Sequence, residues 1–239
     1  VSRASAVDVR VQTQVRLATN IGNGIKHAFK EFDCSEIIFG LHSHDNSSRE
    51  FWGEFAQSVF NGLSRQVIIA RCVQPFSTLR VLRVAVPSRA EFEPGFYRWL
   101  ERLCRLVGNI GCRIVFYCRE DTRGLIERYA SNRHQNLRAD YVEMAKWYEF
   151  RKLAQSIEEE EMLVVVTARR GTVSYKNAFD RLPDELTEYY HGKNLMIIFP
   201  DQYGPAPDTM TFAAAQHTEQ LSAYQTLANF VRKVVGKRL

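Results

Sequence analysis

MLVVVTARRGTVSY, residues 162–175, is the stretch from which we infer the fold. Its first five residues are apolar and three of them are valine, a run of strand length that is typical of a strand buried on both faces of a parallel α/β sheet. The next residues, Thr167–Thr172, are small, basic and rich in hydroxyl groups. Ligands of open parallel sheets bind just beyond the carboxyl ends of the strands. These residues therefore form either an anion site or an ordinary turn with solvated arginines.

The composition sets limits on the class of protein. The chain has 239 residues, of which 45% are hydrophobic and 25% charged, and this is typical of a soluble globular protein with one or two domains. Its net charge of +5 permits acidic partners without requiring nucleic acid, and we expect none of the latter. No stretch approaches the roughly 18 consecutive apolar residues of a membrane span, and no signal-peptide pattern is present. Any membrane attachment is therefore expected to come from outside this sequence.

Cysteine and histidine usage argues against a metal site. The five cysteines are odd in number and lack CxxC spacing, which favours reduced, buried thiols over a disulfide framework or a zinc site. The pair His42 and His44 has no acidic or thiol partner at a metal-site spacing, so we expect no metal. The cysteines are Cys34, Cys72, Cys104, Cys112 and Cys118.

The periodicity of the chain predicts one and a half copies of an α/β unit. Residues 1–75 read as β-α-β-α-β, and a seam at Gln74–Ser77 separates them from a complete β-α-β-α-β-α-β-α-β unit over residues 76–204. In the first unit we expect strands at 7–15, 36–41 and 66–72, with helices over 21–32 and 51–63. In the second we expect strands at 79–86, 112–118, 139–147, 162–166 and 195–199, with helices over 96–110, 122–134 and 148–156 and a helical segment interrupted at Leu182–Pro183.

Residues 205–239 are predicted to form a separate tail. From Thr211 onward the sequence favours an amphipathic helix, and its last eight residues carry four basic side chains and no acid. Such a helix either docks on the sheet domain or a partner, or lies on an anionic membrane surface. Its apolar side chains are Leu221, Tyr224, Leu227, Phe230, Val231, Val234 and Val235.

A tandem of five-stranded parallel units resembles the universal stress protein fold. Several phrases are also similar to the cytosolic C-terminal region of bacterial cation:proton antiporters of the sodium/hydrogen exchanger type. The resemblance spans residues 7–200 and implies a regulatory region on the cytoplasmic side of the inner membrane, joined to a membrane transport domain of the same polypeptide. The phrases are Val9–Val15, Val84–Pro87 with Phe92–Phe96, and Thr167–Tyr175 followed by Leu182–Pro183 and Ile198–Pro200.

The phosphate-binding features of nucleotide-binding stress proteins are eroded in this sequence. The acidic residue that those proteins carry after the first strand is replaced by Val86–Ser88, and the glycine-rich loop Gly-x2-Gly-x9-Gly-Ser/Thr is incomplete in both units. In the first unit Gly53 is followed by Glu54, and in the second only Gly171 lies in the loop. The resulting candidate ligand residues are Thr167, Arg169, Arg170, Gly171, Thr172, Ser88, Gly40 and His42, with a nucleotide as the one cofactor considered.

Two functions remain open at this point. One is a regulatory domain that senses a small ligand such as a nucleotide and biases the antiporter. The other is an assembly module that binds no ligand, in which the units pair within a homodimer. We expect no catalysis, because Walker and Gly-x-Ser-x-Gly motifs are absent and lone acids such as Asp140 and Asp180 are typical surface charges.

Overall fold

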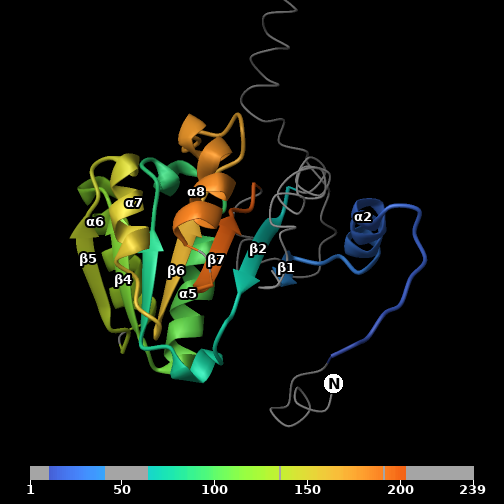
Figure 1. Cartoon of the computed structure of the whole chain (residues 1–239), viewed down its shortest axis with the longest axis horizontal. Coiled ribbons are helices and arrows are strands. Elements are labelled where there is room, and N and C mark those ends of the chain that lie inside the picture. Colours follow the sequence, from blue (N-terminus) through green and yellow to red (C-terminus); the bar gives the residue numbers. More distant parts are fainter. Residues whose placement is uncertain (1–10, 41–63, 135, 191, 203–239) are drawn as a thin grey trace, which may run out of the picture. The chain divides into compact units, whose positions relative to one another are not determined.

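The computed structural model describes residues 11–40, 64–134, 136–190 and 192–202 (Figure 1). The chain divides into two compact units, one containing helix α2 (Ile21–Glu31) and the other containing a seven-stranded sheet. Asn20 caps α2, since its side chain accepts a hydrogen bond from the Asn23 amide. The predicted helix over residues 21–32 is thereby confirmed.

The sheet has the strand order β1-β2-β7-β6-β3-β4-β5. Every neighbouring pair is parallel except β2 and β7, which are antiparallel, so that β1 and β2 run opposite to the other five strands. The strands are β1 (Glu36–Gly40), β2 (Gln66–Arg71), β3 (Val81–Ala85), β4 (Arg113–Cys118), β5 (Ala139–Glu143), β6 (Glu161–Val166) and β7 (Asn194–Phe199).

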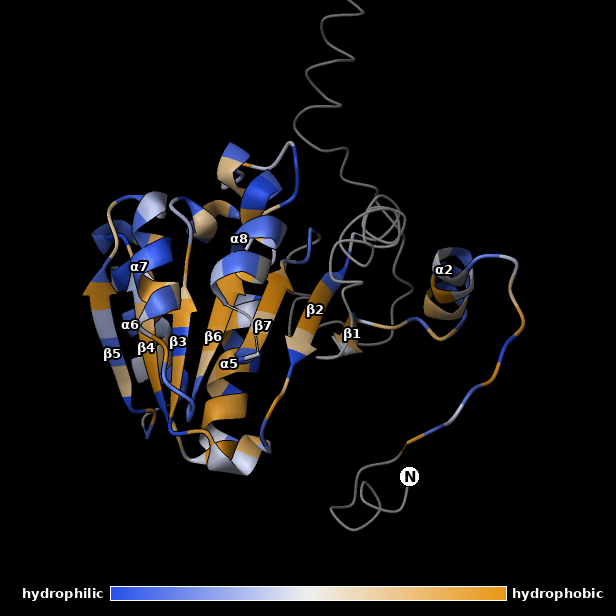
Figure 2. Ribbon diagram, viewed as in Figure 1, coloured by the Kyte–Doolittle hydropathy of each residue, from blue (hydrophilic) through white to orange (hydrophobic). Residues whose placement is uncertain are grey.

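Helices cover both faces of the sheet, with α5 behind it and α7 and α8 in front in Figure 1. The hydropathy colouring is mostly orange on the central strands and mostly blue on α7 and α8, which lie in front of them (Figure 2). Short 3-10 helices at Phe76–Thr78, Ala90–Phe92, Trp147–Glu149 and Asn177–Arg181 join the elements. The longer helices are α5 (Phe96–Ile110), α6 (Glu120–Arg133), α7 (Phe150–Gln155) and α8 (Leu182–Tyr189).

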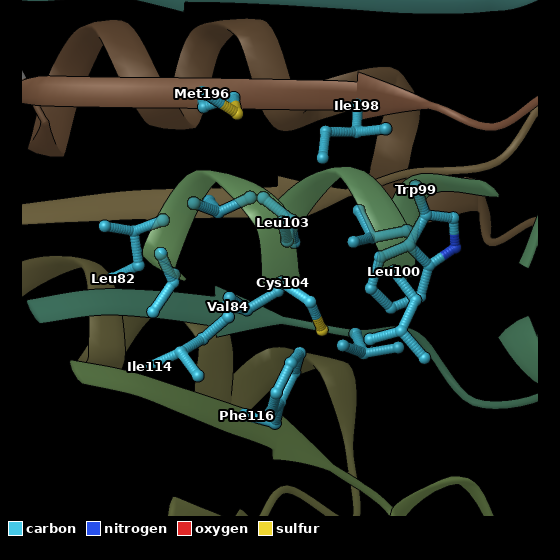
Figure 3. Packing of buried hydrophobic residues seen from close by; sticks show 14 of the residues in the cluster. Leu82, Val84, Trp99, Leu100, Leu103, Cys104, Ile114, Phe116, Met196 and Ile198 are labelled. Carbon is cyan, nitrogen blue, oxygen red and sulfur yellow. The ribbon is translucent and has the colours of Figure 1, made fainter. Parts of the chain in front are cut away.

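Helix α5 builds the core on its face of the sheet. It ends where Gly111 adopts a left-handed conformation with φ of 76° and donates to the Val107 carbonyl, a conformation that glycine takes without strain. Trp99, Leu100 and Leu103 are at most 1% exposed and point toward the strands (Figure 3). Burying each such side chain stabilises the fold by about 1.5–3 kcal/mol. The sheet residues that share this cluster include Val84, Ile114, Phe116, Val164, Met196 and Ile198.

The four strands β1-β2-β7-β6 repeat one arrangement about a local two-fold axis. The central antiparallel pair is Ile69 with Ile197, and the pairing is symmetric on either side of it. Beyond that pair, Ile38 lies beside Ile68 in β1–β2 just as Val164 lies beside Met196 in β6–β7. The two-fold therefore relates β1 to β6 and β2 to β7.

The predicted α/β sheet fold is confirmed, with three local corrections. Residues 11–18 have no regular structure, so the predicted strand at 7–15 is wrong over its described part, and residues 7–10 lie outside the described residues. Leu182–Pro183 begins α8 instead of interrupting a helix, because proline is tolerated in the first helical turn. The sheet is not parallel throughout, since β2 pairs antiparallel with β7, and the division of the chain near residue 75 stays a prediction. The predicted helix over 51–63 and the predicted tail also lie outside the described residues.

Candidate ligand site at the ends of β3 and β6

The carboxyl ends of β3 and β6 lie side by side at the point where the chain leaves the sheet in opposite directions. Strand β3 leads to α5 on one face, whereas β6 leads to α8 on the other, and the two strands are direct neighbours. The two loops diverge at this point, which is the place where open α/β sheets bind their ligands. The loop after β3 and the loop after β6 are therefore the candidate site.

A cationic cluster lies at this switch point. The Lys176 Nζ donates a hydrogen bond of 2.7 Å to Ser88 Oγ and so joins the two loops. Burial lowers the pKa of Lys176, and the nearby cations Arg89 and Arg119 lower it further. An anion placed among these groups would be attracted by all three cations and would relieve their repulsion. We refer to Ser88, Arg89, Arg119 and Lys176 as the switch-point cluster.

The sequence identified only Ser88 of this cluster. Lys176 follows the predicted loop by four residues and comes close to Ser88 only because the chain after β6 returns toward β3. Arg89 carries one recognisable signal in the structure, a positive φ of 68°, which is uncommon for a residue other than glycine. No periodicity or spacing in the sequence indicates either residue.

The loop that follows β6 is held mainly by its own contacts. Thr167 is buried, and its hydroxyl donates to the Ile198 carbonyl at 3.0 Å. The Thr172 hydroxyl donates to the Arg169 carbonyl at 2.9 Å, and Gly171 has a φ of 88° that suits glycine. These three predicted ligand residues thus shape the loop instead of presenting side chains to an empty site.

The two predicted arginines have different environments. Arg169 donates to the Arg65 carbonyl at 2.6 Å, and burial lowers its pKa to about 10 while Asp201 raises it. Arg170 is exposed and pairs with Asp180 at 2.9 Å. Arg169 is therefore part of the sheet's internal structure, whereas Arg170 belongs to a surface ion pair with Asp180, an acid predicted to be a surface charge.

A buried carboxylate of the protein already occupies one set of donors in the site. Glu93 is 7% exposed and accepts hydrogen bonds from the Ser174 amide at 2.8 Å and from the Ser174 hydroxyl at 2.6 Å. It thereby ties the loop after β3 to the loop after β6 over a separation of 81 residues. An anionic ligand would have to bind beside this contact, at the switch-point cluster.

The last two predicted site residues lie elsewhere. Gly40 ends β1, and because β1 and β2 run opposite to β6 it lies at the opposite edge of the sheet from Thr167. It is not brought together with the other candidates. His42 lies outside the described residues.

The thiols differ partly from expectation. Cys104, Cys112 and Cys118 are buried as predicted, whereas Cys34 is half-buried and Cys72 is exposed. In the part of the chain that the structure describes, no three His, Cys, Asp or Glu side chains are grouped so as to hold a metal ion. Within the same residues, no helix is both long and apolar enough to span a bilayer.

Comparison with known proteins identifies solved structures of similar fold. No family model and no curated protein matches the sequence. A universal stress protein from Archaeoglobus fulgidus DSM 4304 is 14% identical with a TM-score of 0.51, over 84% of this chain and 73% of that one. The putative universal stress protein from Pseudomonas aeruginosa UCBPP-PA14 is 11% identical with a TM-score of 0.50, over 84% and 77%.

A transporter domain has the same fold. The cytoplasmic domain of a prokaryotic cation chloride cotransporter is 9% identical to this chain and has a TM-score of 0.56, with 84% of this chain and 78% of that one covered. At these identities the likeness shows architecture alone. The chain therefore has a universal-stress-protein-like α/β fold.

Proposed function

We propose that this chain is the regulatory domain of a transporter, namely the cytosolic part of a monovalent cation:proton antiporter on the cytoplasmic side of the inner membrane. The proposal rests on one observation, which is that the sequence segments similar to the antiporters come together in the structure. Val84–Pro87, Phe92–Phe96 and Thr167–Tyr175 meet at the ends of β3 and β6, where Glu93 bonds Ser174. The cotransporter domain of similar fold supports such a role.

The ligand that we propose for this domain is a small anion of nucleotide type, bound at the switch-point cluster. Lys176 is partly withdrawn from water, and Arg89 and Arg119 are near enough to lower its pKa, although Arg119 also pairs with Asp121 at 3.5 Å. Phosphate groups are the anions best suited to several converging cationic donors. Binding would bias the attached membrane transport domain, and the domain itself would carry out no reaction.

The first test is a thermal-shift screen with ATP, ADP, AMP, NAD and cyclic dinucleotides. A ligand at 100 times its Kd stabilises the folded state by about 2.7 kcal/mol, which raises the Tm of a domain of this size by roughly 5–10 °C. Lys176→Gln should remove the rise, whereas Lys152→Gln, an exposed lysine of α7, should retain it. A flat screen with folded protein, or binding unchanged in Lys176→Gln, would contradict the ligand proposal.

The link to transport needs a separate measurement in the complete polypeptide. Sodium-driven proton flux into vesicles should respond to the ligand found in the screen and should lose that response with Lys176→Gln. Flux that is indifferent to both the ligand and the substitution would argue against regulation through this site, even if binding itself is observed.

The second candidate is an assembly module that binds no ligand. It is favoured by the internal use of the predicted donors, since Arg169, Arg170 and Thr172 already bond to groups of the protein. In that case the domain pairs within a homodimer and the basic tail contacts a partner or the membrane surface. Light scattering across a wide range of protein concentration tests this, and a strictly monomeric protein would count against it.

A further inference from the structure

The face of the sheet that carries α5 has an apolar groove over β1 and β2. The groove has a volume of about 580 Å³ and lies beside Leu103 and Leu106 of α5. Ile38 in its floor is 65% exposed, although a residue of its type in a sheet is normally covered. The strand residues that line it are Glu36, Ile38, Phe39, Gly40, Ile68, Ala70, Met196 and Ile198.

The local two-fold identifies the groove as a position for a helix. On β6 and β7, the residues beneath α5 include Val164, Met196 and Ile198. The two-fold carries these residues onto Ile38, Ile68 and Ala70, and all three line the groove. A helix packed there would thus cover β1 and β2 as α5 covers β6 and β7.

The connection between β1 and β2 is not expected to supply this helix. Parallel neighbours are joined by right-handed crossovers in nearly all cases. The crossover from β3 to β4 places α5 on the groove's face. The step from β1 to β2 goes the same way across the sheet as the step from β3 to β4, but β1 and β2 run antiparallel to β3 and β4. A right-handed connection from β1 to β2 therefore lies on the face opposite to α5.

The C-terminal segment leaves the sheet next to the groove. The Gln202 amide donates to the Ser64 carbonyl, and Asp201 pairs with Arg98 of α5 at 2.8 Å. The groove begins at Arg102, one helical turn or about 6 Å further along α5. The residues between Gln202 and Thr211 are enough to reach it, because an extended chain spans up to about 3.3–3.6 Å per residue.

We propose that the segment 211–239 of the same chain docks in this groove as an amphipathic helix. Its apolar positions from Leu221 to Val235 would extend over roughly 21 Å as a helix, which matches the usual strand length of about 17–20 Å. The basic residues Arg232, Lys233, Lys237 and Arg238 would remain in water. This docking does not depend on the proposed ligand or on transport.

Cys72 provides a direct measurement, because its exposed thiol lines the groove. We would follow alkylation of Cys72 in the full chain by mass spectrometry, with Cys34 as the internal reference. Val231→Asp should raise the Cys72 rate about tenfold, as expected when a helix docked for nine-tenths of the time is released. Asn229→Asp adds the same charge on the opposite side of the predicted helix and should leave the rate unchanged.

A second pair of variants tests the groove itself. Ile38→Asp on β1 should raise the Cys72 rate as Val231→Asp does, whereas Val142→Asp on the other edge strand, β5, should not. Equal Cys72 rates in the unmodified chain and in both groove and tail variants would overturn the proposal. Protection of Cys72 that disappears on dilution would also overturn it, because the groove would then be filled by a second copy.

Discussion

The two halves of the central sheet share one backbone arrangement but differ in what covers them. Val164 of β6 is completely buried under α5, whereas Ile38, which occupies the equivalent position in β1, is 65% exposed. The register of the strands is the same, so the difference arises from the layer above the sheet. Strand pairing and helix coverage are thus separate contributions to this fold.

The sequences of the two halves reflect this difference. Both strands begin with a glutamate, but β6 continues with five apolar residues, Met162–Val166, whereas β1 has only three apolar residues before Gly40. Among the described residues β1 pairs with one strand only, and a short edge strand with a charged residue resists unwanted pairing. The covered half should accordingly determine stability, and the open half should tolerate substitution.

The largest expected effect comes from placing a charge at the two equivalent positions. Val164→Asp buries a carboxylate without a partner and should cost more than about 4 kcal/mol, enough to prevent folding. Ile38→Asp should lower the free energy of unfolding by only about 1.4 kcal/mol, which is the tenfold bias of a helix docked for nine-tenths of the time. Urea denaturation followed by circular dichroism measures both. Similar losses for the two variants would show that β1 is as firmly covered as β6.

A second, smaller effect is expected at the end of β7. Asp201 is 1% exposed, pairs with Arg98 at 2.8 Å and lies near the buried Arg169. Asp201→Asn leaves these guanidinium groups without their counter-charge and should cost about 3 kcal/mol.

The local two-fold relates Ile69 to Ile197. Four residues further along the chain from each, Val73 is the positional equivalent of Asp201, and it is 50% exposed. Val73→Asn is therefore the matched control and should stay within about 0.5 kcal/mol of the unmodified protein. An Asp201→Asn protein as stable as Val73→Asn would mean that the buried ion pairs contribute nothing net.

Local patterns in the sequence predicted the elements whose causes are local. Helix α5 has the predicted bounds of 96–110, because its apolar stripe and the terminating Gly111 both lie within the segment. The alternation in 7–15 predicted a strand, but residues 11–18 are irregular, since a strand also needs a neighbour to bond its backbone. Alternation alone does not show that such a neighbour exists.

The candidate site was predicted less well because its contacts are distant in sequence. The sequence located the correct loop after β6 but assigned Arg169 to a ligand, and its actual neighbour Asp201 follows 32 residues later, beyond another helix and strand. Lys176 reaches Ser88 across 88 residues. Likewise, Gly40 was grouped with the site because the reversal of β1 and β2 follows only from the antiparallel pairing of β2 with β7.

The smallest change in stability is expected from replacing two glutamates that lie on opposite sides of α5. Toward the covered half, Glu101 accepts hydrogen bonds from Tyr129 and Arg105 and contacts His134 at 2.8 Å. Partial burial raises the pKa of Glu101, but these contacts outweigh it and lower the pKa to about 2. Toward the open half, Glu36 makes a 3.0 Å ion pair with the more exposed Arg102.

A lowered pKa means that the unfolded state binds the proton of Glu101 first as the pH falls. The stability from Glu101 is therefore complete above its unfolded pKa of about 4.5 and is lost as the pH decreases toward 2. Glu101→Gln should be less stable than the unmodified protein at pH 6, and the difference should shrink steadily below pH 4.5 in urea titrations.

Glu36→Gln is the comparison on the open side of α5. The Glu36 side chain is 20% exposed and that of Arg102 is 44% exposed, and a partly exposed pair at the protein surface contributes about 1 kcal/mol or less, so this variant should differ little from the unmodified protein at pH 6. If Glu36→Gln instead lost more stability than Glu101→Gln, the strand at the edge would be held more tightly to α5 than its exposure indicates. The groove would then be a rigid part of the core and not a surface available for a helix.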